Sequence, residues 1–456
     1  MKEVSEKEKK HHTRRLSIKE GIFWSVKSSL GDHYLAPFSI AMNASNSIVA
    51  ILNSLWNLGP ISQLFGSRLV GKRSRKSILT KTMAVESFGW LLIALISFLF
   101  YKQILVSLLP IFLLVAVSLF IISGGIGHPS WFSWIGDVVD EKYRGRWFAK
   151  RSTILSFTTI ILAITAAFLL EYLKKINQPV IGFIFLFSIA FLARFTCIKI
   201  IRSHYEPKLK LRKKDNYSLK EFFQDFGKTN FGKFAAFRLM FAFSMGLTSP
   251  LVAIYLLRYL GFDYITFILI AISGTMFSVI TLNLWGKISD KYGNYKVIAL
   301  TTLIIPLTPL LWILSPSRIY LFIVPAIFGG TAWTAFLISS GNFIYDNISK
   351  QKRGKAISYF NLMIGLGAFA GGLTSAYLIK VINTSWIEPL FLIFLIGTLA
   401  RMIVVGIWIP LLKEIKHKRK LKNFKELGNL VIKQAKPIIL EDIHEIVEIK
   451  NYISEK

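Results

Sequence analysis

Cysteine and acidic residues are scarce in this sequence, and each scarcity excludes a class of protein. A single cysteine, Cys197, stands among 456 residues, so neither a disulfide framework nor a cysteine-based metal site is available. The 25 acidic residues are outnumbered by 56 lysines and arginines, which gives a formal net charge of +31. Charged residues make up only 18% of the chain and hydrophobic residues 53%. This composition is too apolar for an ordinary soluble protein of this length.

Signatures of catalysis are missing as well. The sequence has no HExxH pattern, no serine-nucleophile elbow, no dense His/Asp metal cluster and no Walker-type nucleotide site. The run GLGAFAGG at 365–372 follows no predicted strand and precedes no Lys-Ser or Lys-Thr, so we interpret it as a close helix-packing surface. The start, MKEVSEKEKKHHTRRLS, lacks the apolar core of a cleavable signal peptide. We therefore expect no enzyme, no primary pump, no cofactor and no bound metal.

Apolar runs of the length that a helix needs to cross a bilayer recur along the chain. They predict twelve membrane spans, six on each side of a polar linker, at 21–43, 47–69, 78–101, 104–135, 148–170, 180–201, 234–256, 264–285, 296–314, 319–345, 356–379 and 388–411. The predicted fold class is an all-α polytopic membrane protein with two pseudo-symmetric six-helix bundles, 21–201 and 232–412. The other segments are an N-terminal tail, 1–20, a central linker, 202–231, and a C-terminal tail, 413–456.

Lysine and arginine are concentrated in alternate loops and in both tails. The positive-inside rule then predicts a multi-pass protein of the plasma membrane with both termini in the cytoplasm. A basic cytoplasmic face attracts anionic lipid headgroups, so we expect membrane lipids and not nucleic acid as the partner of this charge. In the C-terminal tail, Ile443, Ile446, Val447, Lys450 and Ile453 fall at helical spacing and predict a short amphipathic helix.

One ten-residue pattern occurs twice. The segment DVVDEKYRGR at 137–146 and the segment DNISKQKRGK at 346–355 each contain Asp, six residues, Arg-Gly and a base. Each copy follows the fourth predicted span of its half. The tripeptide Leu-Ala-Arg also recurs, in the sixth and the twelfth span, where it ends at Arg194 and Arg401. These matches predict two parallel halves.

The loop GKISDKYGNYK at 286–296 resembles the short cytoplasmic loop of the major facilitator superfamily, with the form G-x-x-x-D-(R/K)-x-G-x-x-(R/K). The resemblance extends over 21–411. In the first half, the corresponding loop at 66–76 has Val70 at the aspartate position and Arg73 at the second glycine, so it lacks the acid. The fifth span lacks the glycine-proline motif typical of many drug antiporters of this superfamily, which weakens a multidrug-exporter interpretation.

The resemblance implies a secondary active transporter that moves a small solute by alternating access, as symporter or antiporter. A monomer suffices for this mechanism, so we expect one. The resemblance also implies a cytoplasmic gate of charged and glycine residues, namely Asp290, Lys291, Gly286, Gly293, Lys296, Asp137, Arg144, Arg146, Asp346, Arg353 and Arg68. We hypothesise that Asp290 engages the start of the fifth span near Gly145 and Arg146. The alternative is that these residues only fix topology and cap helices.

Ionisable residues within spans are costly and therefore candidates for function. Asp32 and His33 fall near the middle of the first span, where either could exchange a proton as access alternates or could only stabilise packing. The full set of substrate or proton candidates is Asp32, His33, Asn53, Asn57, His128, Trp131, Arg238 and Asn342. For Glu86, Arg194 and Arg401 we expect packing or snorkelling.

Two other functions remain open at this stage. A transporter-like sensor or scaffold without transport is consistent with the altered first-half loop and the long tails, and a membrane enzyme is disfavoured by the missing motifs. The identity of the solute, the direction of its movement and the coupling ion, for which H⁺ is one option, do not follow from the residues.

Overall fold

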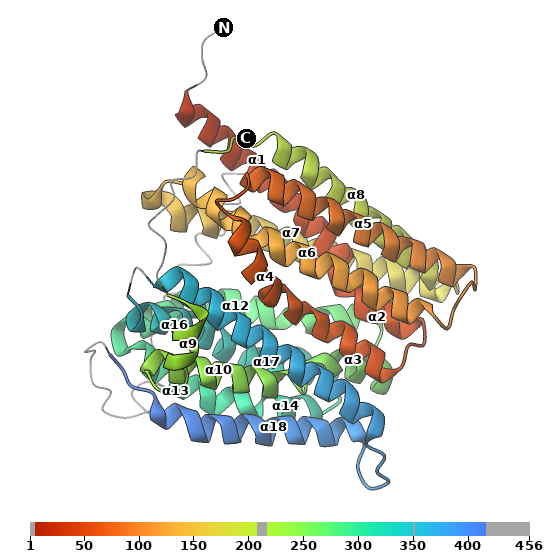
Figure 1. Ribbon diagram of the computed structural model, residues 1–456. Helices are drawn as coiled ribbons and strands as arrows, with labels where there is room; N and C mark the ends of the chain where they lie inside the picture. The colour runs from red at the N-terminus through yellow and green to blue at the C-terminus, as the bar shows by residue number, and fades with distance from the viewer. Residues whose placement is uncertain (1–4, 208–216, 350–351, 416–456) are drawn as a thin grey trace. The chain divides into compact units, whose positions relative to one another are not determined.

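The computed structural model describes residues 5–207, 217–349 and 352–415, and this part of the chain is helical without a single strand (Figure 1). The predicted C-terminal amphipathic helix and residues 208–216 of the predicted linker lie outside the described residues. Eleven helices among the described residues are long and apolar enough to cross a membrane. An all-α polytopic membrane protein is therefore confirmed.

All eleven spans correspond closely to predicted spans, in the same order along the chain, and the last of them is Pro389–Leu411. The predicted first span, 21–43, is not among them. Its residues form the end of α1, Glu6–Leu30, a 3-10 turn, η1, Asp32–Tyr34, and α2, Leu35–Ala41. Lys27, Asp32 and His33 make this segment more polar than the others. Residues 6–20, expected to be part of a tail, continue α1 as one helix.

The chain divides into two compact units. Unit 1 comprises the described parts of Met1–Lys214 together with Ala242–Ile268 and Ser358–Ile393. Unit 2 comprises the described parts of Asp215–Phe241, Leu269–Ile357 and Phe394–Lys456. The predicted boundary between two sequence halves at the central linker stays a prediction.

The first eight helices belong to unit 1. After α1 and α2 they are α3 Asn46–Ser54, α4 Leu58–Leu69, α5 Arg75–Tyr101, α6 Leu109–Val138, α7 Arg144–Lys175 and α8 Pro179–Arg202. Figure 1 shows α5 between α6 and α8, and α5 contacts both. Helix α1 packs on α7 and α8, and α4 packs on α6. Gly66 marks the α4–α6 approach, because a Cβ there would lie 2.2 Å from the carbonyl oxygen of Ile126.

The later helices are α9 Leu219–Asp225, α10 Asn230–Gly246, α11 Val252–Ile254, α12 Tyr264–Tyr292, α13 Asn294–Ile304, α14 Thr308–Ile313, α15 Arg318–Pro325, α16 Thr331–Asn347, α17 Arg353–Val381 and α18 Pro389–Trp408. In unit 2, α13 packs on α16. One π-helical turn, η7, Ala326–Gly330, joins α15 to α16 and directly follows Pro325, which cannot supply a backbone N–H.

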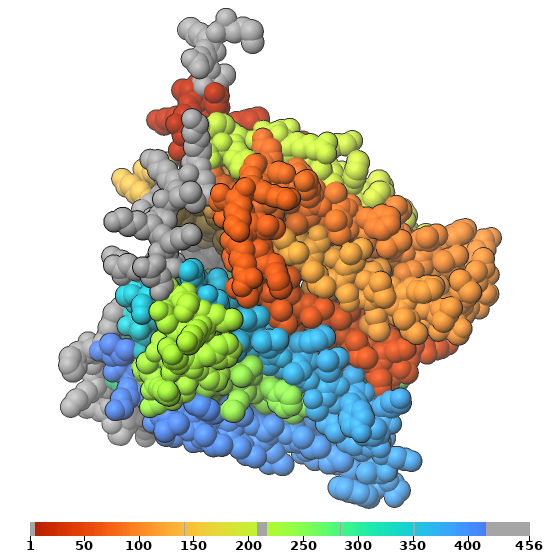
Figure 2. Space-filling view, viewed as in Figure 1, coloured from red at the N-terminus to blue at the C-terminus, as the bar shows by residue number. Residues whose placement is uncertain are grey.

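Large apolar side chains remain exposed on the outer faces of the helices. On α18, whose side chains are drawn in blue in Figure 2, they include Leu399, Ile403 and Ile407. Val115 on α6 is 63% exposed. Such surfaces are stable in contact with lipid and would be unfavourable in water.

Candidate functional site

One face of α1 carries the polar residues of the candidate site. Glu20, Trp24 and Lys27 are spaced four and three residues apart and so lie on one side of the helix. The helix starts with a capping box, in which Ser5 and Glu8 exchange hydrogen bonds. It ends at Gly31, where a Cβ would lie 2.4 Å from the Trp90 ring. The packing of Trp90 against this glycine sets the position of the turn that follows.

An ionic cluster joins four helices of unit 1 beneath this face. The guanidinium of Arg194 on α8 donates two hydrogen bonds, of 2.8 and 2.7 Å, to the carboxylate of Glu86 on α5. The third guanidinium nitrogen of Arg194 lies 3.8 Å from the carboxylate of Glu20, and the guanidinium of Arg151 on α7 lies 3.3 Å from it. Arg151 also donates to the carbonyl oxygen of Ser17 at 3.3 Å. The four charged groups therefore balance one another.

A second ion pair joins the end of α1 to the 3-10 turn η1 that follows it. The ammonium of Lys27 lies 2.9 and 3.3 Å from the two carboxylate oxygens of Asp32, which belongs to η1. Three aromatic rings surround this ammonium, with centroids 5.4 Å away for Trp24, 6.0 Å for Trp90 and 5.9 Å for Phe120. Cation–π attraction from these rings stabilises a lysine that is only 4% exposed.

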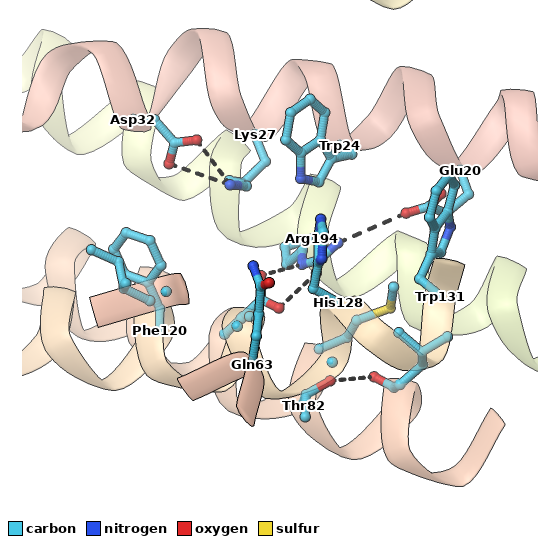
Figure 3. A pocket seen from close by; sticks show the side chains of 18 of the residues that line it. Glu20, Trp24, Lys27, Asp32, Gln63, Thr82, Phe120, His128, Trp131 and Arg194 are labelled. Carbon is cyan, nitrogen blue, oxygen red and sulfur yellow. Dashed lines mark hydrogen bonds and ion pairs between the residues drawn. The ribbon is translucent and has the colours of Figure 1, made fainter. Parts of the chain in front are cut away.

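Both groups of charges line one cavity of about 420 Å³ in unit 1 (Figure 3). Figure 3 shows Glu20, Trp24, Lys27 and Asp32 along one strip, with Gln63, His128 and Trp131 opposite them. The cavity wall carries three acids and three Lys or Arg bases, which are Glu20, Asp32, Glu86, Lys27, Arg151 and Arg194. Aromatic rings of α1, η2 Leu55–Asn57 and α6 complete the wall. The cavity thus offers both charge and stacking surfaces without a net formal charge.

Several predicted candidates meet at this cavity. Asp32, His128 and Trp131 line it, and the guanidinium of Arg151 stacks over Trp131 at 4.6 Å. His33 is not among its lining residues. The presence of Asp32, His128 and Trp131 in the cavity wall does not test their roles in transport, which stay predictions.

The two predicted asparagines hydrogen-bond to backbone carbonyls of unit 1. The amide of Asn53 donates to the carbonyl oxygen of Pro250 at 2.9 Å, and that of Asn57 donates to the carbonyl oxygen of Ser54 at 3.1 Å. Arg238 and Asn342 belong to unit 2 and are not among the residues that line the cavity.

Five charged cavity residues were missing from the predicted set of functional residues: Glu20, Lys27, Arg151, Glu86 and Arg194. Of the two roles expected for Arg194 and Arg401, packing or snorkelling, their burial is consistent with packing and not with snorkelling, because the two residues are 6% and 2% exposed. Arg194 is held by Glu86, and Arg401 donates to the hydroxyl of Thr308 at 3.1 Å. The available signal was the presence of an acid and bases inside apolar spans.

The repeated ten-residue segments have repeated geometry. In unit 1, Arg144 donates to the carbonyl oxygens of Gly136 at 2.8 Å and Val139 at 3.5 Å, at the end of α6. In unit 2, Arg353 donates to those of Tyr345 at 3.1 Å and Ile348 at 3.3 Å, at the end of α16. Both arginines therefore cap the helix that precedes them.

The two aspartates of the repeat hold the start of a different helix in each copy. Asp137 accepts from Arg75, the first residue of α5, at 2.5 Å, and Arg75 lies 3.6 Å from Glu206. Asp346 accepts from Asn294, the first residue of α13, at 2.7 Å. A cation thus occupies in unit 1 the place that a neutral amide occupies in unit 2.

A glutamate caps the same helix start in both copies. The backbone N–H of Arg75 donates to Glu206 at 2.7 Å, and that of Tyr295 donates to Glu414 at 3.0 Å. Burial raises the pKa of Glu414 above its ordinary value, against the lowering effect of the Tyr295 hydrogen bond. Carboxylates are favoured at helix N-termini.

The remaining predicted gate residues occupy the ends of helices. Gly286, Asp290 and Lys291 lie in the last turns of α12, and Lys296 lies in the first turn of α13. Between them Gly293 has φ +103°, a conformation that favours glycine. Arg68 lies in the last turn of α4, with its guanidinium 6.0 Å from the Phe65 ring, and Arg146 lies in the first turn of α7. The gating role of these residues stays a prediction.

Comparison with known proteins agrees with this architecture. The sequence profile of the Major Facilitator Superfamily matches residues 234–442. No curated protein matches the sequence significantly. The fold is similar to that of an auto-inhibited POT family peptide transporter, with a TM-score of 0.69, 12% identity and coverage of 90% of this chain and 99% of that one.

Two further solved structures show the same similarity of fold. A mutant of the nucleoside transporter NupG aligns with a TM-score of 0.64 and 16% identity, over 89% of this chain and 100% of that chain. A bacterial homolog of the human lysosomal transporter Spinster aligns with a TM-score of 0.61 and 12% identity, over 89% and 97%. The Major Facilitator Superfamily match over residues 234–442, the apolar spans and the similarity of fold to solved transporters together support a secondary transporter of this superfamily.

Proposed function

We propose that this protein moves a small solute across the plasma membrane by alternating access, with the cavity of unit 1 as part of the solute path and H⁺ as the coupling ion. The observation that carries the proposal is the cavity itself, which is lined by charges that would be costly in the membrane interior if they had no role. A monomer with cytoplasmic termini is the form we propose for the working protein.

Asp32 is the residue we propose as the proton acceptor. It faces a single cation, whereas Glu20 and Glu86 share Arg151 and Arg194. Its side chain is also the most exposed of the three, at 13% against 4% and 6%. Protonation of Asp32 would release Lys27, and the changed charge would favour one of two conformations.

The carboxylates at helix starts are the proposed cytoplasmic gate. In this proposal the contacts of Asp137 with Arg75 and of Asp346 with Asn294 hold helix ends in place in one conformation and are rearranged in the other. Charge-assisted hydrogen bonds at a wet boundary are strong enough to hold a closed state and reversible enough to release it. Asp290 remains the acid that we propose to engage the start of the fifth span.

Flux in proteoliposomes tests the proposal. The full chain is reconstituted and counterflow is measured first with a nucleoside, uridine, and a dipeptide, dialanine, because the structural neighbours include a nucleoside transporter and a peptide transporter. A metabolite panel, screened by thermal shift, follows. We expect saturable counterflow of at least one solute, and a pH gradient should change its rate.

Two variants separate coupling from transport. Asp32→Asn should abolish the response to the pH gradient while counterflow of the same solute persists. Glu171→Gln, which alters an acid of α7 that is not among the cavity-lining residues, should keep the response. A pH response that is intact in Asp32→Asn would overturn the proton assignment. Absence of any saturable flux would instead favour the sensor or scaffold alternative.

A further inference from the structure

Unit 2 contains a buried arginine whose partners among the described residues are aromatic rings. Arg238 on α10 is 5% exposed. Its guanidinium carbon lies 4.7 Å from the ring centroid of Phe336 and 5.8 Å from that of Trp333, both on α16. Its Nε donor is buried without a hydrogen-bond acceptor, and no carboxylate of the described residues pairs with the group.

This arrangement leaves a cation beside aromatic rings, with no counter-anion among the described residues. Aromatic faces attract a guanidinium, but they provide no hydrogen-bond acceptor in its plane. Buried charges in proteins are normally paired, because desolvation of an ion costs several kcal/mol. The other buried arginines differ, since Arg75 and Arg194 have carboxylates and Arg401 has a hydroxyl. Arg238 therefore lacks the partner that its chemistry requires.

A second unsatisfied polar group lies on the same face of α16. Ser340 is 4% exposed, and its hydroxyl has no hydrogen-bond partner in the described part of the chain. Positions 333, 336, 340 and 343 follow helical spacing and so share one face. That face packs on α10, because Phe343 lies 4.8 Å from Phe234 and Phe336 lies 5.6 Å from Phe241, measured between ring centroids. Ser340 is thus set between the two aromatic contacts, along the part of α10 that bears Arg238.

The helix beside this pair is locally irregular. The π-helical turn η7 ends at Gly330, three residues before Trp333. Turns of this kind occur often at functional sites, because they loosen the regular hydrogen-bond ladder. The hydroxyl of Ser278 on α12 donates to the carbonyl oxygen of Gly330 at 3.2 Å, so this backbone acceptor of the irregular turn has a hydrogen-bond donor. Trp333 is also only partly buried, so it forms the side of the aromatic shell from which a ligand could enter.

From these observations we infer that Arg238 and Ser340 form an oxyanion site, which binds a carboxylate or phosphate group between α10 and α16. The guanidinium supplies charge and a planar pair of donors, which suit both groups. The Ser340 hydroxyl supplies one further donor. The rings of Trp333 and Phe336 exclude water and flank the body of the ligand. The oxyanion comes from a soluble organic acid or from a lipid headgroup, which have this chemistry in common.

Binding to the full chain tests the site without any measurement of transport. Purified protein in maltoside detergent, in Tris chloride buffer, is titrated with benzoate or phenyl phosphate and its thermal unfolding is followed. Benzamide is the matched neutral compound. We expect a concentration-dependent rise in Tm with the two anions and none with benzamide. A parallel arm compares nanodiscs of phosphatidylcholine alone with nanodiscs that also contain phosphatidylglycerol, so that a rise in Tm confined to anionic nanodiscs identifies a lipid as the source.

Variants test the two donors. Arg238→Met should remove the response to the anions, Arg238→Lys should keep a weaker one, and Ser340→Ala should reduce the apparent affinity about tenfold. Arg401→Met, which alters another buried arginine of unit 2, should keep the response. In the absence of anions, Arg238→Met should unfold at the same temperature as the wild type or a higher one, because it removes an unpaired buried charge.

The outcomes separate a binding site from a packing role. A wild-type protein that responds to neither soluble anions nor anionic lipid would overturn the site, as would an equal response in Arg238→Met. An Arg238→Met protein that is clearly less stable without ligand would point to packing alone. Binding can succeed while flux fails, so this test and the test of transport are independent.

Discussion

The pair formed by Glu86 and Arg194 allows the sharpest stability prediction. Glu86→Gln leaves the 6%-exposed Arg194 without its bidentate acceptor and with only Glu20, at 3.8 Å, as an acid. Removing one member of a buried ion pair typically costs about 3–5 kcal/mol. At about 2 °C per kcal/mol for a large domain, the expected loss in Tm is roughly 6–10 °C. The double variant Glu86→Leu/Arg194→Met removes both charges and should recover most of that loss.

The single cysteine of the chain provides the assay. Cys197 is fully buried in unit 1, where its thiol lies 3.5 Å from the carbonyl oxygen of Glu20. A thiol-reactive fluorophore should therefore label the protein only when unit 1 opens, and the temperature of labelling reports the stability of this unit. A matched control is Glu171→Gln, whose carboxylate accepts one backbone N–H at 3.2 Å and should change the temperature little. If Glu86→Gln labels at the wild-type temperature, or if the double variant labels earlier than the single one, the argument from buried charge is wrong.

Three further predictions concern a histidine, a glycine and the repeated arginines. Burial lowers the pKa of His204 to about 4, so the folded protein binds fewer protons than the unfolded chain in this pH range. Stability should therefore fall as the pH drops from about 6.5 to about 4. The variant His204→Gln should flatten that pH dependence in thermal scans. Gly31→Ala places a Cβ against Trp90 and should cost about 1–3 kcal/mol, measured by the labelling temperature of the buried thiol; an unchanged temperature would mean that the turn shifts freely. Arg144→Ala and Arg353→Ala each remove a cap from a preceding helix and should lower the free energy of unfolding by similar, small amounts, about 1 kcal/mol each, as measured by thermal unfolding; a large loss in only one would refute equivalent roles.

The sequence by itself determined the class of protein and the position of nearly every span. Apolar runs bounded by lysines and arginines predicted helices whose ends agree with those in the structure to within a few residues. The agreement arises because the length and hydropathy of a span are local properties that the bilayer imposes. The repeat was also readable from the residues, since Arg144 and Arg353 cap helix ends that lie only a few positions upstream. Local contacts of this kind follow from spacing along the chain.

Only the tertiary structure decided which charges meet. Glu86 and Arg194 are 108 residues apart, and their pairing depends on the rotation of α5 and α8 about their axes, which packing sets. The same holds for Glu20 with Arg151, and for the three rings that surround Lys27. Arg238 illustrates the converse, because only the packed helices reveal that this buried cation has aromatic neighbours and, within the part of the chain that the structure describes, no acid beside it. The rotation of each helix about its axis decides whether a buried charged residue meets a partner of opposite charge, and no local sequence pattern specifies that rotation.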